Sequence, residues 1–172
     1  MITAYIALGS NLGNPQRQLS LAYAAIAQLP GSHIQAASSL YGSAAIGPGT
    51  QPDYLNAVVC LRTALGPNEL LENLQQIELA QGRVREEHWA ARTLDLDILL
   101  YDDRQLDSPS LTIPHPRMTQ RNFVLYPLLE IAGANFQLPD GRELGTLVMD
   151  CPRGDLAQNA PDFTHHCPGR SH

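Results

Sequence analysis

The chain has 172 residues, an apolar share of 44% and a formal net charge of −6, so it can bury the core of about one domain, and its charge argues against a nucleic-acid-binding protein. It contains no lysine, which excludes a Walker A loop, the strand lysine of protein kinases and Schiff-base catalysis. No apolar run approaches the roughly 18 residues that span a bilayer, no charged leader opens the chain, and the three cysteines are far apart. We therefore expect a cytoplasmic protein that contacts no membrane.

Hydrophobic spacing predicts six main elements in the order β-α-β-β-α-β. The first helix begins at Asn14 as the N-cap and Pro15 at the first helical position, and the second begins at Pro67. This order is that of the ferredoxin-like split βαβ arrangement, so we predict an α+β fold of that type. The expected elements are a strand at 3–8, a helix at 14–29, strands at 33–41 and 54–65, a helix at 67–82 and a strand at 93–101.

The remaining segments are predicted as loops, short helices and a tail. The run Gly-Ser-Asn-Leu-Gly after the first strand is predicted as a plain turn in preference to an anion-binding loop. A single domain is expected over 1–150, with extra short helices after the fourth strand. The polar, Pro/Gly-rich residues 151–172 predict a flexible tail, to whose composition we attribute His165, His166 and Cys167 in preference to a zinc site. Long loops are expected at 42–52 and 83–92, and helices around 118 and at 123–131.

Asp95 and Asp97 stand two positions apart in the last predicted strand. Side chains alternate between the faces of a strand, so these carboxylates share one face. Two neighbouring carboxylates repel each other unless a cation lies between them, and Mg²⁺ completed by substrate phosphates meets that need. The alternative is an edge strand with a solvated acidic face. The arginine-rich loop just upstream favours a site for phosphoryl transfer.

Arginine supplies every permanently charged side-chain cation of this chain. Its planar guanidinium matches the geometry of phosphate oxygens. Genome bias is an alternative explanation for the lack of lysine, but it explains the clustering less well. Six arginines fall within a single segment of the sequence, namely Arg83, Arg85, Arg92, Arg104, Arg117 and Arg121.

Three other segments carry side chains that could bind a flat heterocycle or a phosphate. Trp89, in the charged loop, is interpreted either as a lid that stacks on a substrate or as a core residue. Tyr54 and Asn56 share a face at the start of the third strand. Asn56 could bind the edge of a heterocycle, or both residues could be ordinary first residues of a strand with no ligand. His115 and Arg117 lie on a predicted turn that either contacts phosphate or is a plain surface turn.

Taken together, these segments resemble the hydroxymethyldihydropterin pyrophosphokinase family over about residues 3–145. The most specific motif surrounds Asp95 and Asp97, and the second combines His115 with Arg121 and Phe123. Several motifs in the same order are more specific than any one of them. They lie at residues 9–13, 51–56, 78–85, 88–99, 111–118 and 121–132.

The resemblance implies a ferredoxin-like fold that transfers the β,γ-pyrophosphoryl group of ATP to the hydroxymethyl group of a dihydropterin and releases AMP. It implies that Asp95 and Asp97 hold two Mg²⁺ ions. The residues implied around the ATP phosphates or ribose are Arg83, Arg85, Arg92, His115 and Arg121, of which Arg83 and Arg92 would be catalytic. Those implied along the nucleotide site are Gln75, Glu78, Ile98 and Thr112. Those implied along the pterin site are Ser43, Ala44, Ile46, Tyr54, Asn56, Trp89 and Phe123.

Two departures from the family pattern affect loops, and neither removes the carboxylates. Ser43-Ala44 replaces a frequent Thr-Pro, and Ala90-Ala91 replaces a frequent Gly-Pro, which leaves that loop less restrained. We expect a monomeric enzyme whose partners are ATP and the pterin. The alternatives are a catalytically silent module that binds a nucleotide or pterin, and a different ATP-dependent transferase on the same fold.

Overall fold

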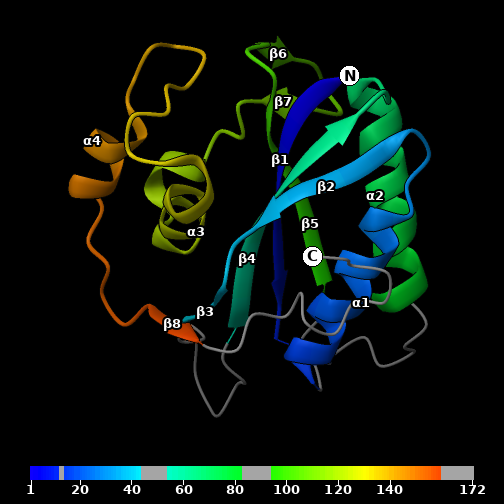
Figure 1. Ribbon diagram of the computed structural model, residues 1–172, viewed down its shortest axis with the longest axis horizontal. Coiled ribbons are helices and arrows are strands. Elements are labelled where there is room, and N and C mark those ends of the chain that lie inside the picture. Colours follow the sequence, from blue (N-terminus) through cyan, green and yellow to red (C-terminus); the bar gives the residue numbers. More distant parts are fainter. Residues whose placement is uncertain (12–13, 44–53, 83–93, 160–172) are drawn as a thin grey trace.

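The computed structural model describes residues 1–11, 14–43, 54–82 and 94–159 (Figure 1). Both loops of the sequence prediction lie largely outside these ranges. Six of the residues implied for the site also lie outside the described residues. They are Ala44, Ile46, Arg83, Arg85, Trp89 and Arg92.

A mixed α+β fold is built on one antiparallel sheet, as the sequence predicts at the level of fold class. Strand β1 (Ile2–Ser10) lies between β4 (Tyr54–Thr63) and β5 (Leu94–Tyr101). Two shorter strands, β2 (Ser32–Ala37) and β3 (Leu40–Ser43), both pair with β4 on its other side. The last strand, β8 (Ala157–Asn159), pairs with β3 and gives the sheet path β5-β1-β4-β3-β8.

Helices cover both faces of this sheet (Figure 1). Helix α1 (Pro15–Ala27) and helix α2 (Pro67–Gly82) lie on one face, while α3 (Asn122–Ala132) and the short α4 (Leu144–Met149) lie on the other. Helix α1 begins as predicted, because the side chain of Asn14 accepts a hydrogen bond from the backbone N–H of Arg17 at 3.1 Å. Two helical layers therefore enclose the sheet.

Strand β1 contributes alternate residues to two separate cores. Ala4, Ile6 and Leu8 lie in the core shared with α1 and α2. Tyr5 and Ala7 face the second core, which α3 and α4 cover. The β1 side chains on this second face therefore form the surface of the sheet that faces α3.

Helix α3 is fastened to the β2–β3 connection by a carboxylate. Glu130 accepts hydrogen bonds from the hydroxyls of Tyr41 at 2.7 Å and Ser39 at 2.9 Å, and from the Ser39 backbone N–H at 3.0 Å. The neighbouring Ser38 binds the backbone of Val58 through both its N–H and its hydroxyl. These contacts interrupt the single strand that was predicted at 33–41 and divide it into β2 and β3.

Two predictions about irregular segments are wrong in part. Gly9 and Ser10, predicted as part of a turn, continue β1, because they pair with β4 and β5 on either side. Residues 151–159, predicted as the start of a flexible tail, belong to the fold and end in β8. Local polarity suggested a loop in each case, whereas long-range strand pairing decided the structure. Residues 160–172 lie outside the described part of the chain.

In the segment between β5 and α3, the sequence predicts the helical piece but not the strands. It contains a two-stranded sheet of β6 (Leu106–Asp107) and β7 (Thr112–Ile113), followed by the 3₁₀ turn η1 (Met118–Gln120). The last element matches the helical piece expected around Met118. Within the described ranges, no helix combines the length and apolar character needed to cross a membrane.

Candidate functional site

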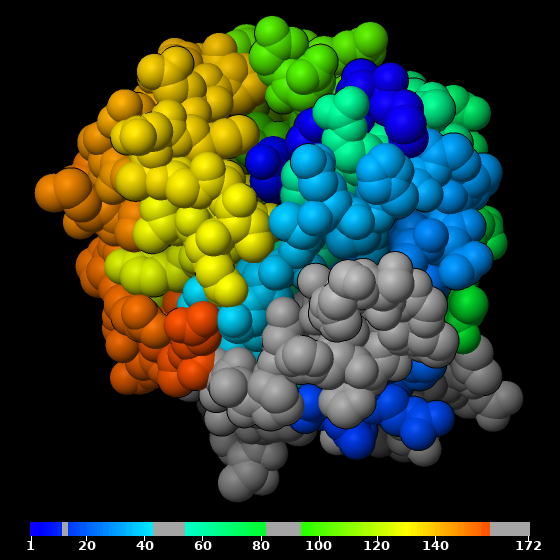
Figure 2. Space-filling view, in the orientation of Figure 1, coloured from blue at the N-terminus to red at the C-terminus, as the bar shows by residue number. Residues whose placement is uncertain are grey.

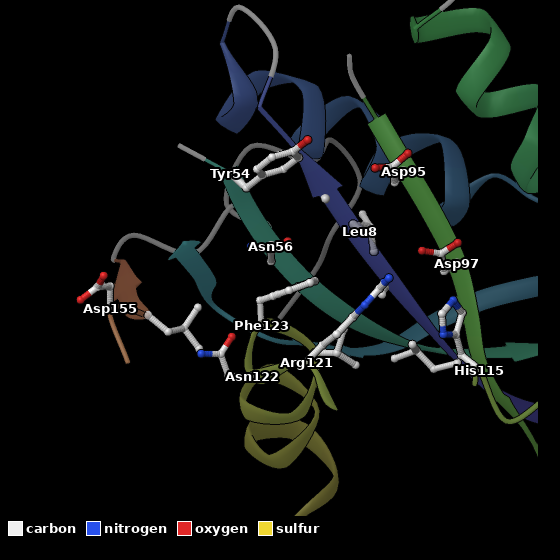
Figure 3. A pocket seen from close by; sticks show the side chains of 15 residues that line it. Leu8, Tyr54, Asn56, Asp95, Asp97, His115, Arg121, Asn122, Phe123 and Asp155 are labelled. Atoms are coloured by element: carbon white, nitrogen blue, oxygen red, sulfur yellow. The ribbon is translucent and has the colours of Figure 1, made fainter. Parts of the chain in front are cut away.

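A cavity of about 620 Å³ lies on the α3 side of the sheet (Figure 3). Its floor is formed by β1, β4 and β5, and its walls come from the start of α3 and from the segment before β8. The lining residues are Ala7, Leu8, Gly9, Tyr54, Asn56, Asp95, Asp97, Leu99, His115, Arg121, Asn122, Phe123, Val124, Asp155 and Leu156.

Small residues on the central strand open this cavity. Gly9 pairs with Asn56 on one neighbouring strand and with Asp95 on the other. Ala7 holds the equivalent position beside Asp97. A Cβ atom on Gly9 would stand 3.1 Å from Oδ1 of Asn56, so the absence of a side chain leaves room for that carboxamide. The register therefore presents an amide and two carboxylates across one glycine-containing strand.

The alternation of β5 places Asp95 and Asp97 on the cavity face, as the sequence predicts. Asp95 is exposed and Asp97 half-buried, whereas Leu94, Leu96 and Ile98 are buried in the opposite core. Within the described ranges, no third His, Cys, Asp or Glu joins them in a cluster of three. Two carboxylates fit a hard, oxygen-preferring cation such as Mg²⁺, whose other ligands are usually water and phosphate.

His115 stands beside the carboxylates at the same end of the cavity (Figure 3). Its backbone N–H binds the carbonyl of Leu99 at 3.0 Å, and its Nδ1 accepts the N–H of Arg117 at 3.2 Å. Nε2 is thus the nitrogen that carries the proton of the neutral ring. Burial lowers the pKa of His115, Asp97 opposes that shift, and Arg121 and Arg117 reinforce it.

The start of α3 adds a cation and an aromatic ring. The guanidinium carbon of Arg121 lies 5.6 Å from the ring centroid of Phe123, within the range of a cation–π contact. Figure 3 shows Arg121 extending from α3 across the cavity toward the side on which Asp97 and His115 lie. A positive charge and a flat apolar surface therefore adjoin the same space.

The structure brings together seven residues that sequence reasoning placed in the site. They are Tyr54, Asn56, Asp95, Asp97, His115, Arg121 and Phe123. This juxtaposition joins β4, β5, the segment after β7, and α3, which are far apart in the sequence.

Four other expected residues are described but do not line this cavity, and of a fifth, Ser43, the structure describes only the backbone. Gln75 is exposed on α2, and Ile98 is 3% exposed within the core on the opposite side of the sheet. Glu78, also on α2, accepts the backbone N–H of Leu96 at 2.8 Å. Thr112 lies in β7, and the backbone of Ser43 pairs with Tyr54 at the end of β3.

Sequence reasoning missed several residues of the cavity. Gly9 was interpreted as part of a turn, although a glycine at the end of a buried strand is a signal of close approach. Asn122 directly precedes a residue that was identified. Asp155 and Leu156 lie in the predicted tail, and no periodicity or motif in that segment points to them.

Comparison with known proteins gives a consistent set of relatives. A family model described as 7,8-dihydro-6-hydroxymethylpterin-pyrophosphokinase matches residues 5–133. A Pseudomonas aeruginosa protein named 2-amino-4-hydroxy-6-hydroxymethyldihydropteridine pyrophosphokinase is 50% identical over 148 residues, which are 86% of this chain and 91% of that protein. A Haemophilus influenzae protein of the same name is 52% identical over 148 residues, which are 86% of this chain and 92% of that protein.

Solved structures show the same fold at lower identity. The crystal structure of wild-type Plasmodium falciparum HPPK-DHPS superimposes with a TM-score of 0.65 at 14% identity and covers 87% of this chain. A triple mutant of that protein with SDX-DHP gives a TM-score of 0.67 at 16% identity, again over 87% of this chain. The matched region is 44% of the Plasmodium chain in each case.

Proposed function

Because the chain belongs to the 7,8-dihydro-6-hydroxymethylpterin-pyrophosphokinase family, we propose that it transfers the β,γ-pyrophosphoryl group of ATP to the hydroxymethyl group of 6-hydroxymethyl-7,8-dihydropterin, a step of folate biosynthesis. The products are the pterin pyrophosphate and AMP. The observation that carries this proposal is one cavity lined by a carboxylate pair, an arginine, an amide and an aromatic ring. The amide and the aromatic ring suit a flat polar heterocycle, and the carboxylate pair and the arginine suit a polyphosphate with its metal ions.

The heterocycle binds at the end of the cavity formed by Asn56, Tyr54 and Phe123. The carboxamide of Asn56 offers both donors and an acceptor to the edge of a pterin ring. The ring of Phe123 offers a face for stacking, and Arg121 lies over that ring as well. Because Gly9 has no side chain, the carboxamide of Asn56 has the space to face the ring.

The phosphates bind at the end that holds Asp95, Asp97, His115 and Arg121. Asp95 and Asp97 would hold Mg²⁺, two ions by the family resemblance, and bound Mg²⁺ would neutralise phosphate charge. Arg121 attracts the anionic chain, and the Nε2–H of neutral His115 donates to a phosphate oxygen. In the ligand-free protein, burial lowers the pKa of His115, which favours the neutral ring, and Arg121 supplies a permanent positive charge.

In the reaction the hydroxymethyl oxygen forms a bond to the β-phosphorus of ATP. The bond from that phosphorus to the oxygen bridging the α-phosphate breaks, and the electron pair leaves with AMP. The hydroxyl proton departs, and Asp97 is our candidate for its first acceptor. The protein contributes chiefly by positioning, because Asn56 and Phe123 fix the pterin while Arg121 and His115 fix the phosphates.

Further assignments extend this proposal beyond the cavity. We assign Arg83, Arg85 and Arg92 to the phosphates, and Trp89, Ala44 and Ile46 to the pterin, on the strength of the family resemblance. Gln75, Glu78, Ile98 and Thr112 are assigned to the nucleotide site, and Ser43 to the pterin site, on the same basis. The strand order β5-β1-β4-β2 supports a ferredoxin-like description of the core.

The deciding experiment measures AMP formation from ATP and the pterin alcohol, with Mg²⁺ and with a chelator. We expect AMP and the pterin pyrophosphate in equal amounts with Mg²⁺ and neither with the chelator. Binding of both ligands without AMP would identify a silent module instead. AMP formation without quenching of pterin fluorescence would indicate a different acceptor.

A further inference from the structure

The segment from Cys151 to Asn159 lies outside residues 5–133 that the family model matches, yet it closes one side of the cavity. It follows α4, passes the start of α3 and ends as β8 beside β3. Figure 2 shows the residues of this segment, coloured orange to red, packed on the surface beside those of α3 and α4. It therefore reaches the site from the side opposite β5.

Side-chain contacts with α3 fasten this segment in place. The hydroxyl of Tyr126 donates to the carbonyl of Cys151 at 2.9 Å, and Nδ2 of Asn122 donates to the carbonyl of Arg153 at 2.8 Å. Arg153 in turn donates through Nε to the carbonyl of Leu156 at 3.0 Å, and its guanidinium carbon lies 5.5 Å from the centroid of the Tyr126 ring. The turn that carries residues 155 and 156 is thus held at both ends.

Two adjacent residues of this fastened turn line the cavity, and they differ in burial: Leu156 is buried, whereas Asp155 is exposed at its rim. Leu156 lines the cavity and is 5% exposed, so it belongs to a packed wall. Asp155 lines it as well, and its carboxylate has no hydrogen-bond or ion-pair partner among the described residues. Figure 3 shows Asp155 at the opposite end of the cavity from Asp95, Asp97 and His115, with Phe123 between.

We propose that residues 151–159 form a selectivity wall for the heterocycle, in which Leu156 contacts the ring system and Asp155 accepts hydrogen bonds from its N–H groups. This inference rests on the proposed function. A reduced aminopterin ring carries N–H donors and no negative charge, so a carboxylate favours it. The same carboxylate disfavours a polyphosphate at this end. The wall thereby helps to decide which substrate occupies which end.

The test uses the full chain and measures two affinities separately. Pterin binding is followed by the fluorescence of the pterin, and nucleotide binding by titration with a non-hydrolysable ATP analogue and Mg²⁺. The variants are Leu156→Ala, Asp155→Ala and Asp155→Asn, with Asp150→Asn as a matched control. Asp150 directly precedes this segment, is exposed and does not line the cavity.

We expect Leu156→Ala and Asp155→Ala to weaken pterin binding about tenfold, the usual cost of one lost pocket contact or hydrogen bond, and to leave nucleotide affinity unchanged. Asp155→Asn, which keeps one acceptor oxygen, should have a smaller effect, and Asp150→Asn none. Tyr126→Phe removes only the hydroxyl that binds Cys151, so it should weaken pterin binding through the position of the wall.

Two results would overturn the wall. One is that the Leu156 and Asp155 variants bind pterin with the same affinity as the parent. The other is an equal loss of both affinities together with a lower melting temperature, which would reveal a purely structural role. If the parent binds no pterin and forms no AMP, the proposed function itself fails. If the parent protein forms AMP and the Asp155 and Leu156 variants bind pterin as tightly as the parent, only the proposed role of residues 151–159 fails, and the proposed function stands.

Discussion

The carboxylate of Glu78 accepts a hydrogen bond from the backbone N–H of Leu96, with 2.8 Å between Oε2 and N. Leu96 stands between Asp95 and Asp97 on β5, which is an edge strand of the sheet. An edge strand presents backbone groups without a partner strand, and here α2 supplies a partner. Glu78 therefore holds the stretch of β5 that displays both cavity carboxylates.

Replacing Glu78 with Ala should cost about 1–2 kcal/mol of the free energy of unfolding, because the Leu96 N–H loses its acceptor. It should also reduce the turnover rate, because the carboxylate pair loses its support. Glu72→Ala on the same helix is the control, since Glu72 is exposed. Urea unfolding and single-turnover kinetics measure the two effects. Equal rates in both variants would show that β5 needs no support from α2.

Asp95→Ala and Asp97→Ala should fold at least as stably as the parent, because each removes like-charge repulsion in the metal-free protein. The transfer barrier should rise by on the order of 4 kcal/mol or more, while pterin binding without metal is largely retained. Asp103→Ala provides the control, since Asp103 is exposed just beyond β5. Thermal melting, pterin affinity and single-turnover rate are compared. An unfolded variant, or one with the parental rate, would refute the assignment for that residue.

Gly9→Ala should weaken pterin binding without unfolding the protein. The new Cβ would stand 3.1 Å from Oδ1 of Asn56, so the carboxamide must shift by a few tenths of an ångström and lose its alignment with the ring. Gly66→Ala is the control, because its Cβ would meet Oε1 of Glu69 at 3.4 Å, an ordinary contact. Pterin titration of both variants tests this. Parental affinity in Gly9→Ala would mean that the orientation of Asn56 is not critical.

The stability of the ligand-free protein should fall as the pH drops below 6.5. The pKa of His115 is lowered from 6.5 in the folded state, so the unfolded chain binds the proton more readily in that range. Its contribution to stability is therefore complete above pH 6.5 and is lost as the pH falls through the folded-state pKa. His115→Gln should flatten this part of the profile. Unfolding free energies between pH 5 and 8, roughly the range in which histidine titrates, provide the measurement.

Local rules were sufficient for parts of the fold that depend on neighbouring residues. The cap at Asn14 and the helical spacing of Leu19, Ala22, Tyr23 and Ile26 place α1 within its predicted range. They failed at Ser38 and Ser39, where contacts with Val58 and Glu130 divide a predicted strand. Those partners lie 20 and 91 residues away in sequence, beyond the reach of any pattern in a short window.

The sequence by itself determined that Asp95 and Asp97 share a face, because strand alternation is a property of the local backbone. It also determined which residues resemble a pterin pyrophosphokinase. Only the tertiary structure decided that Gly9 stands between Asn56 and Asp95, since strand register is set by packing across the whole sheet. Only the tertiary structure brought Asp155 to the cavity, because contacts with Asn122 and Tyr126 hold a segment whose composition alone predicts a tail.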